Sequence, residues 1–515
     1  MRVESERTFS YWLFWLVLVA MVLVFPGFVW HENTSGFLTD DGMYLLLADF
    51  FSPFHERNVL VERLVIDQSR FPPAFPVLIG LFGGGSQNMH VAHLVTCATF
   101  IASAVVFYAW AERTLGSREI AAACLAIFAL LPKTLTYVLE IWSEYLYMTF
   151  VFAALILMDV CKRSEHHAHH ALLACALLTG LTLLTRTIGA ALLAVFLLFL
   201  FVYRVGRKPY YISIALTLPV FWEVVKTISG YGGSYSEDLT QYTSWNGALT
   251  LLFSDLPTNA YLLFQAWGEH FAAPPEATWF LRVLSVLLLG LAAIGGVDRA
   301  VRKCPDFYYL AAYVSIVLVW PHSNHISRFL YPLIPIALVY AFAGTSILAR
   351  TWKPGPRSWA NTGLSALILA MIVPNVLFVV SRFYAPMPQH ISQDYRHTRE
   401  WLSADPDWAS RHSELKDVIV KLMGRIDEHI APYECVYAVH PVSTVLYSDR
   451  RAIMLPQQAS IDKLRLCDYL FVMNLVGMFD ANYPLDEIDR DKLALLDMQS
   501  DSQGRPQAFL FRIQR

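Results

Sequence analysis

The stretch YWLFWLVLVAMVLVFPGFVW, residues Tyr11 to Trp30, decides the kind of fold that this chain can adopt. It is uncharged, and its length is that of a helix that crosses the hydrocarbon core of a bilayer, which takes about 20 apolar residues. It has no clear small-residue cleavage site of a secretory signal peptide, so we expect it to stay in the protein as a membrane span.

The composition of the whole chain agrees with this. The 515 residues are 56% hydrophobic and only 16% charged, and the mean hydropathy is +0.43. A soluble globule needs more polar surface, so we predict an integral membrane protein. The formal net charge of -3 argues against a nucleic-acid partner, which would require a concentrated basic patch.

Apolar stretches of spanning length recur, and we predict about eleven between Tyr11 and Arg382. Lys and Arg residues gather in alternate short loops, which the positive-inside rule assigns to the cytoplasm. These residues are Arg113, Arg118, Lys162, Arg163, Arg204, Arg207, Lys208, Arg299, Arg302, Lys303, Arg350, Lys353 and Arg357.

The intervening loops differ in charge. Residues 227–281 contain no Lys or Arg but five acidic residues, so we place them on the outer face together with the loop that begins at His31 and ends at Arg70. An odd number of spans then puts the N-terminus in the cytoplasm and the tail outside.

The tail is expected to be a separate water-soluble domain. We divide the chain into a transmembrane domain, residues 1–383, and a small outer α/β domain, residues 384–515. A helix is predicted over residues 394–402, and the short apolar runs 436–439 and 469–472 are typical of buried strands. Cys435 and Cys467 lie beside these strands and could pair in an oxidising compartment or remain free thiols.

Histidines gather in residues 166–170, the sequence HHAHH. Four histidines could bind a metal, but no acidic or Cys partner accompanies them in the loop. We therefore interpret this run as part of a solvated cytoplasmic loop.

The acidic pair Asp40-Asp41 follows the first span. Adjacent carboxylates at a membrane face mark either a wet loop or a site of proton or metal chemistry, because they are costly to hold near hydrocarbon. An Asp in a partly solvated outer loop is ionised at neutral pH and can act as a general base.

Four basic residues stand at outer ends of spans or loops, where the positive-inside rule disfavours them: Arg70, Lys133, Arg186 and Arg328. Each could pair with a carboxylate such as Glu140 or Glu144. Together they fit an anionic headgroup better, and a lipid phosphate would reach them at membrane level. If that phosphate leaves a sugar anomeric carbon, the basic residues stabilise the departing charge while a carboxylate deprotonates the attacking group.

Five short motifs occur in the order found in a known family: Asp40-Asp41-Gly42-Met43-Tyr44 with Ala48, Arg70-Phe71-Pro72-Pro73-Ala74-Phe75-Pro76, Ser143-Glu144, Leu184-Thr185-Arg186, and Arg328-Phe329-Leu330-Tyr331-Pro332-Leu333-Ile334-Pro335. In these motifs the chain resembles the GT-C superfamily of membrane glycosyltransferases, and within it the protein O-mannosyltransferases and the bacterial lipid A aminoarabinose transferases.

The resemblance implies a GT-C-like fold in a bacterial inner membrane, with a periplasmic C-terminal domain and a catalytic outer loop over residues 31–76. It also implies an inverting enzyme that moves a sugar from a polyprenyl-phosphate carrier to an outer-face acceptor. Asp40 would be the catalytic base, with Asp41 beside it, and Arg186 and Arg328 would contact the lipid phosphate. Two positions depart from the family pattern. Asp41 stands where many relatives have Glu. Phe71 stands where some relatives place a Lys, so the phosphate contact at that position falls to Arg70 or is absent.

We expect no cofactor and no metal. Asp40 and Asp41 could share a divalent cation, as in the oligosaccharyltransferase branch, but the wider set of acidic ligands is not visible.

Four residues are candidates for the substrate cavity, each with an alternative. Tyr44 could orient Asp40 or anchor the chain at the interface, and Glu144 could bind sugar hydroxyls or neutralise Lys133, the role that we slightly favour. His322 and His325 could line the cavity or be interfacial residues at a helix end.

Two other functions remain open. A transporter or flippase of lipid-linked saccharides usually has its charges near the midplane, whereas here they gather at one face. A non-catalytic scaffold would not require Asp40. The sugar, the acceptor, the role of the C-terminal domain and the oligomeric state do not follow from the sequence.

Overall fold

The computed structural model describes residues 2–30, 40–55, 71–163, 168–229, 240, 242–271, 278–321, 325–352, 357–383, 406–455, 464–473 and 490–514. Arg70, His322 and the helix predicted over residues 394–402 lie outside these ranges, as does part of the histidine run.

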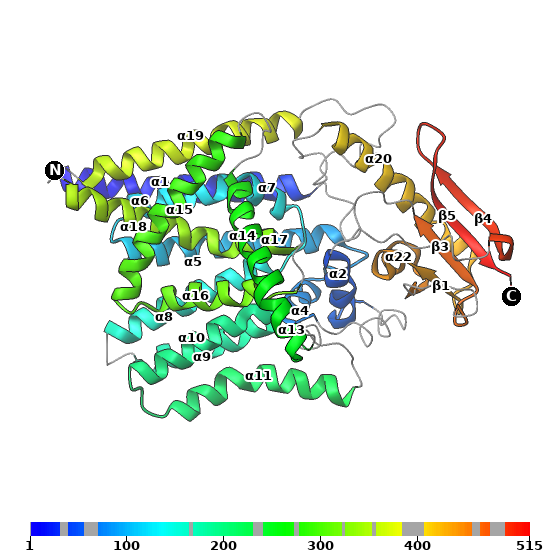
Figure 1. The fold of residues 1–515 in the computed structure, drawn as a ribbon, viewed down its shortest axis with the longest axis horizontal. Coiled ribbons are helices and arrows are strands. Elements are labelled where there is room, and N and C mark those ends of the chain that lie inside the picture. The colour runs from blue at the N-terminus through cyan, green and yellow to red at the C-terminus, as the bar shows by residue number, and fades with distance from the viewer. Residues whose placement is uncertain are drawn as a thin grey trace.

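The N-terminal part is a bundle of long helices, most of which run side by side in Figure 1. Their bounds are α1 (Arg2–Val29), α5 (Met89–Leu115), α6 (Arg118–Leu130), α8 (Glu144–Arg163), α9 (Ala168–Thr185), α10 (Ala190–Val202), α11 (Lys208–Ile228), α14 (Leu256–Phe271), α15 (Thr278–Val301), α16 (Pro305–Leu318), α18 (Ile334–Trp352) and α19 (Arg357–Phe383).

Five helical segments within the described ranges are long and apolar enough to cross a membrane: Met89–Leu115, Glu144–Arg163, Lys208–Ile228, Arg282–Val301 and Ile326–Arg350. Five shorter apolar helices accompany them: Trp12–Gly27, His169–Thr185, Thr187–Val202, Pro305–Leu318 and Trp359–Pro374. The helical, apolar character predicted from the sequence is thus observed, but the number of about eleven spans is not confirmed.

Local sequence explains where neighbouring helices end and begin. Gly116 ends α5 in the left-handed conformation (φ 68°), which a residue without a Cβ adopts easily. Ser117 then caps α6, because its Oγ accepts a hydrogen bond from the Ile120 N–H at 3.3 Å. A tight turn results between two antiparallel helices.

Helices α15 and α18 touch through their backbones. A Cβ added to Gly295 would lie 2.0 Å from the Tyr340 carbonyl oxygen, and one added to Gly344 would lie 2.1 Å from the Leu291 oxygen. Small residues at such crossings let membrane helices gain van der Waals contact where the hydrophobic effect does not drive association.

Shorter helices complete the bundle: α2 (Asp40–Phe51), α4 (Ala74–Leu81), α7 (Pro132–Val138), α13 (Trp245–Thr250), a π-helical turn (Leu251–Asp255), α17 (Ile326–Leu330), and the 3₁₀ turns η1 (Thr187–Gly189) and η5 (Tyr331–Leu333). Of these, α2 is firmly held. A Cβ at Gly80 of α4 would lie 2.5 Å from the Ala48 oxygen. The Asp49 carboxylate accepts from the Ser86 N–H (3.0 and 3.2 Å) and from His55 Nδ1 (2.8 Å). These contacts fix the helix that begins with Asp40.

The C-terminal part is an α/β unit, as predicted. It contains α20 (Pro406–Met423), α21 (Ile426–His429), β1 (Cys435–Ala438), α22 (Pro441–Ser448), β2 (Arg451–Met454), β3 (Tyr469–Met473), the 3₁₀ turn η9 (Arg490–Lys492), β4 (Leu493–Ser500) and β5 (Pro506–Ile513). The sheet order is β2-β1-β3-β5-β4, with β1 parallel to β2 and β3, and β5 antiparallel to β3 and β4. Both predicted strands are confirmed as β1 and β3.

A disulfide joins Cys435, at the start of β1, to Cys467, just before β3. The open question of their pairing is thus answered: the bridge links the two central parallel strands at one end.

The sheet unit packs on the helix bundle through α22, which lies beside α2 in Figure 1. Val442 and Val445 of α22 belong to the same buried hydrophobic cluster as Met43 and Leu46 of α2. The C-terminal unit therefore rests on the helix that carries the acidic pair.

Candidate active site

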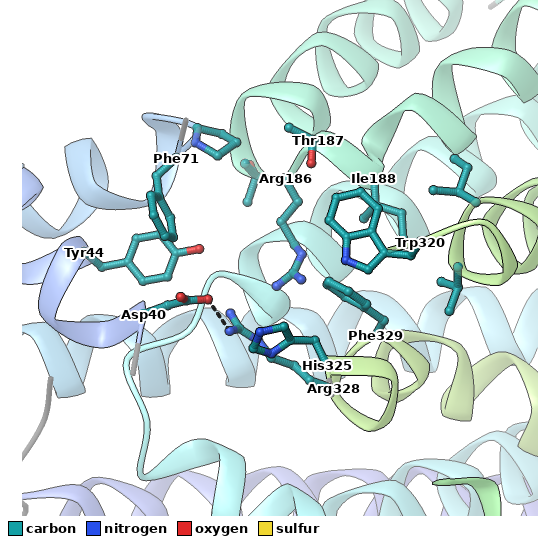
Figure 2. A pocket seen from close by; sticks show the side chains of 14 residues that line it. Asp40, Tyr44, Phe71, Arg186, Thr187, Ile188, Trp320, His325, Arg328 and Phe329 are labelled. Atoms are coloured by element: carbon teal, nitrogen blue, oxygen red, sulfur yellow. Dashed lines mark hydrogen bonds and ion pairs between the residues drawn. The ribbon is translucent and has the colours of Figure 1, made fainter. Parts of the chain in front are cut away.

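A cavity of about 250 Å³ opens beside the start of α2. Four segments distant in sequence form its walls: Asp40 and Tyr44 of α2, residues 71–72, residues 185–188 between α9 and α10, and residues from α16 to α17. Figure 2 shows Asp40, Arg186 and Arg328 turned toward one another in this space.

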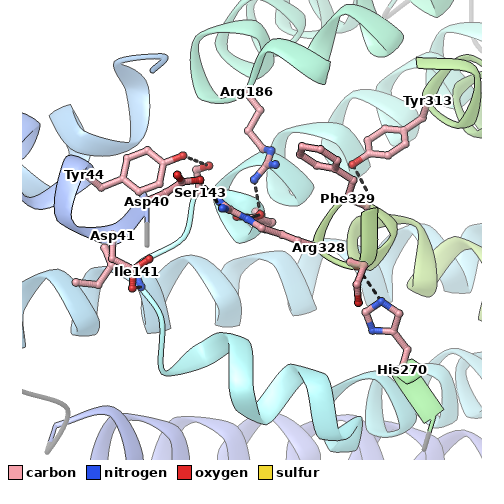
Figure 3. Close-up of polar contacts among 12 residues, drawn as sticks. Asp40, Asp41, Tyr44, Ile141, Ser143, Arg186, His270, Tyr313, Arg328 and Phe329 are labelled. Atoms are coloured by element: carbon pink, nitrogen blue, oxygen red, sulfur yellow. Dashed lines mark hydrogen bonds and ion pairs between the residues drawn. The ribbon is translucent and has the colours of Figure 1, made fainter. Parts of the chain in front are cut away.

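The charged groups form one connected network. Arg328 Nη1 donates to Asp40 Oδ2 at 2.5 Å, and its Nε donates to Glu144 Oε1. Arg186 Nη1 forms an ion pair with the same oxygen of Glu144. Glu144 thus bridges two guanidinium groups, and Arg328 bridges two carboxylates. Figure 3 shows the side chains of Arg186 and Arg328 beside Asp40.

Three side chains of this network are almost completely buried. The exposed fraction of the side chain is 1% for Glu144, 9% for Arg186 and 11% for Arg328. Arg328 also lies over the Trp142 ring, 4.1 Å from its centroid, which adds a cation–π contact. Glu144 and Asp40 together balance the charges of the two guanidinium groups, which offsets part of the cost of burying them.

Asp40 is the solvent-accessible end of the network, with 38% of its side chain exposed. Burial by itself would raise the pKa of Asp40, but the charge and hydrogen bond of Arg328, with smaller effects from His325 and Arg186, outweigh it. The pKa therefore lies below its ordinary value, and the carboxylate is ionised at neutral pH.

Asp41 faces the other way. Its side chain is buried, and Oδ2 accepts from the Ile141 N–H at 3.1 Å. Burial raises the pKa of Asp41, and the bond from Ile141 opposes only part of that effect. Asp41 does not line the cavity; it ties α2 to the segment that leads into α8.

Three solved structures resemble the chain along most of its length. They are ArnT from Cupriavidus metallidurans bound to undecaprenyl phosphate (TM-score 0.52, 12% identity, 96% of this chain and 97% of that chain), the Archaeoglobus fulgidus oligosaccharyltransferase in the apo form (0.51, 11%, 89% and 69%), and the arabinofuranosyltransferase AftD from Mycobacteria (0.50, 15%, 97% and 41%). All three are GT-C glycosyltransferases.

The chain has the GT-C fold. No family model and no curated protein matches the sequence, so the likeness lies in the structure alone.

Within this GT-C fold, the predicted site residues divide into three groups. Asp40, Tyr44, Arg186, His325 and Arg328 line the cavity, and Glu144 holds its two arginines in place. Asp41 and Lys133 are not among the lining residues. Arg70 and His322 lie outside the described residues.

One predicted contact is corrected. Glu144 pairs with Arg186 and Arg328, whereas neutralisation of Lys133 was the favoured expectation; Lys133 instead lies near the buried His270. The Tyr44 hydroxyl hydrogen-bonds to Ser143 Oγ at 2.9 Å. Whether Tyr44 orients Asp40 stays a prediction.

Two residues that line the cavity, Trp320 and Phe329, were not predicted as site residues from the sequence. Trp320 and Phe329 form an aromatic wall, with ring centroids 5.5 Å apart. Their position near the ends of spans could have indicated a role in the site. Aromatic residues at that level are also common as ordinary interfacial anchors, so the position alone does not identify a site residue.

His440 is the least expected neighbour of the site, because it belongs to the C-terminal unit. It precedes α22, where Nδ1 interacts with the Ser443 hydroxyl at 2.8 Å. Burial lowers the pKa of His440 to about 4, although nearby Asp40 acts in the opposite direction. A neutral imidazole therefore lies near the catalytic candidate.

No group of three or more His, Cys, Asp and Glu side chains suited to a metal occurs among the described residues. Asp40 and Asp41 have different partners, Arg328 and Ile141. The Asp, Glu, Lys and Arg side chains that line the cavity within the described ranges are one carboxylate, Asp40, and two guanidinium groups, Arg186 and Arg328.

Proposed function

We propose that the protein is an inverting glycosyltransferase that moves a sugar from a polyprenyl-phosphate carrier to an acceptor on the outer face of a bacterial inner membrane. The observation that carries the proposal is the convergence of Asp40, Arg186 and Arg328 on one cavity. An ionised carboxylate beside two fixed guanidinium groups suits removal of a proton at one end of a reacting centre and stabilisation of negative charge at the other.

Arg186 and Arg328 are the proposed phosphate site. Guanidinium groups bind phosphate oxygens in a planar, bidentate manner, and Glu144 holds both of them in position. Ile316, Val317 and Trp320 give the cavity an apolar wall, which fits the first units of a polyprenyl chain. ArnT, with the same fold, was solved bound to undecaprenyl phosphate.

The Asp40–Arg328 ion pair suggests an order of events. A donor phosphate that binds Arg328 competes with Asp40 for the same guanidinium group. When Asp40 loses this partner, its pKa rises, and the carboxylate becomes a better proton acceptor. Donor binding would thereby prepare the base, so that Asp40 is active only when a donor is present.

Transfer then forms one bond to the anomeric carbon, from the acceptor, and breaks another, to the phosphate. Asp40 takes the proton from the acceptor hydroxyl or amine as that atom attacks the anomeric carbon. The bond between this carbon and the phosphate oxygen breaks, and its electron pair leaves with the polyprenyl phosphate. Arg186 and Arg328 stabilise the charge on the leaving oxygen. These fixed cations supply the electrostatic role that a metal plays elsewhere, and we propose that none is required.

The test uses the purified chain, a synthetic polyprenyl-phosphate sugar with a radiolabelled sugar, and a membrane extract as the source of acceptor. We expect label to leave the lipid and polyprenyl phosphate to accumulate. A flippase would move the donor across a vesicle membrane with its sugar–phosphate bond intact, so intact donor on both sides would contradict the proposal.

A further inference from the structure

A second cavity, of about 280 Å³, lies at the other end of the helix bundle. It is formed by the last turns of α5, α8 and α15 and the first turn of α16. Helix α8 runs from Glu144, in the Asp40 network, to Lys162 and Arg163, in this cavity. From Glu144 to Lys162 the helix rises about 27 Å at 1.5 Å per residue, close to the roughly 30 Å thickness of the hydrocarbon core.

The lining is strongly basic. It includes Arg113, Lys162, Arg163, Arg299 and Arg302, against the carboxylates of Asp159 and Asp306. The lining therefore has an excess of three positive charges. Trp110, Leu155 and Ile156 add an apolar portion to the same hollow.

Some of these cations are already paired. Arg299 binds Asp306 through two hydrogen bonds, of 2.7 and 3.0 Å, and the Tyr340 hydroxyl donates to the same carboxylate at 2.8 Å. Arg163 pairs with Asp159 at 2.9 Å. These contacts fix the walls of the cavity and use both of its carboxylates.

Arg113 and Lys162 are different. Within the described residues, neither forms an ion pair with a carboxylate: Lys162 Nζ donates to the Arg302 carbonyl at 3.4 Å and lies 5.7 Å from the centroid of the Tyr203 ring. No carboxylate of the described residues balances their charges, and apolar residues of the same two helices line the hollow beside them. An anion with an attached apolar chain has both features that this surface matches.

We propose that this cavity, at the end that the positive-inside rule assigns to the cytoplasm, binds the phosphate headgroup of an anionic phospholipid. Arg113 and Lys162 contact the phosphate, and the partly exposed Ile156, with the buried Trp110 and Leu155 behind it, contacts the beginning of an acyl chain. Such a lipid would tie together α5, α8 and the turn between α15 and α16. The site is independent of the Asp40 cavity and of the transfer reaction.

The experiment measures thermal unfolding of the full-length chain in mixed micelles of detergent with phosphatidylglycerol or with phosphatidylcholine. Phosphatidylglycerol should raise the Tm of the wild type more than phosphatidylcholine does. The variant Arg113→Gln with Lys162→Gln should lose more than half of this difference. The matched control is Arg204→Gln with Arg207→Gln, which removes two cations from the same end outside the cavity and should retain it.

Equal losses in the variant and its control would overturn the proposal, because they would indicate diffuse attraction to all basic loops. Sodium phosphate at the same phosphate concentration and ionic strength distinguishes a lipid from a free anion. An equal rise in Tm with sodium phosphate would overturn the lipid assignment. If the double variant fails to fold, Arg113→Gln alone changes one exposed side chain and should lower the phosphatidylglycerol effect in the same direction.

Discussion

Replacement of Arg328 by Gln should be costly for both stability and transfer. Arg328 is 11% exposed and contacts Glu144, Asp40 and the Trp142 ring. Removal of one partner of a buried ion pair costs about 3–5 kcal/mol. Glu144 keeps Arg186 as a partner, and Asp40 is partly solvated, so we expect the lower end, about 3 kcal/mol of unfolding free energy.

Loss of Arg328 should also lower the transfer rate by roughly 10²–10³-fold, as observed when one fixed donor to a developing negative charge is removed. The pH dependence supplies an independent measure. Because Arg328 holds the pKa of Asp40 below its ordinary value, its removal raises that pKa. At acidic pH a smaller fraction of Asp40 is then ionised in the free enzyme, and the acid limb of the kcat/KM profile for the donor moves to higher pH.

Unfolding by sodium dodecyl sulfate, followed by tryptophan fluorescence, measures the stability change. The matched control is Arg118→Gln: Arg118 pairs with Glu112 at 2.7 Å, but it is 52% exposed, and its loss should leave stability nearly unchanged. If both variants unfold at the wild-type detergent fraction, the Asp40–Arg328–Glu144 network does not contribute to the fold as argued.

Three further predictions concern the site and the C-terminal unit. Arg186→Ala should weaken binding of a polyprenyl-phosphate sugar, and Arg186→Lys should restore it only partly because the planar fork is lost; equal binding by wild type and Arg186→Ala in an equilibrium assay would make Arg186 purely structural. Excess chelator should leave transfer unchanged; a loss that manganese or magnesium reverses would place a metal in the reaction. The Cys435→Ser, Cys467→Ser variant should lose about 2–4 kcal/mol of stability in the C-terminal unit, and protease should digest that unit faster than in the wild type. Equal digestion rates of the variant, the wild type and the wild type with reductant would contradict this.

The convergence of Asp40, Arg186 and Arg328 could be anticipated from sequence for a definite reason. Each residue stands at the end of an apolar stretch that the charge pattern assigns to the same face, so side chains hundreds of residues apart must share one level in the bilayer. The strands around Val436 and Leu470 were also predictable, because apolar runs of about four residues between polar segments are too short for a buried helix.

The partners within the site could not be predicted in this way. Glu144 and Lys133 stand at one membrane level in the sequence pattern, but the level alone does not choose between Lys133 and the two arginines. Asp40 and Asp41 are adjacent, yet successive residues of a helix point about 100° apart, so one lines the cavity and the other binds Ile141. His440 lies near Asp40 because α22 packs on α2, a contact between distant parts of the chain.

The most direct test of the account is transfer by Asp40→Asn, with donor binding measured in the same preparation. The amide keeps the shape of the side chain and removes the proton acceptor, while Arg186, Arg328 and Glu144 remain. Asp41→Asn is the matched control, because its carboxylate lies outside the cavity. The account predicts that Asp40→Asn binds the donor and loses transfer, and that Asp41→Asn, if folded, retains much more. Wild-type transfer by Asp40→Asn would contradict the assignment of Asp40 as the base.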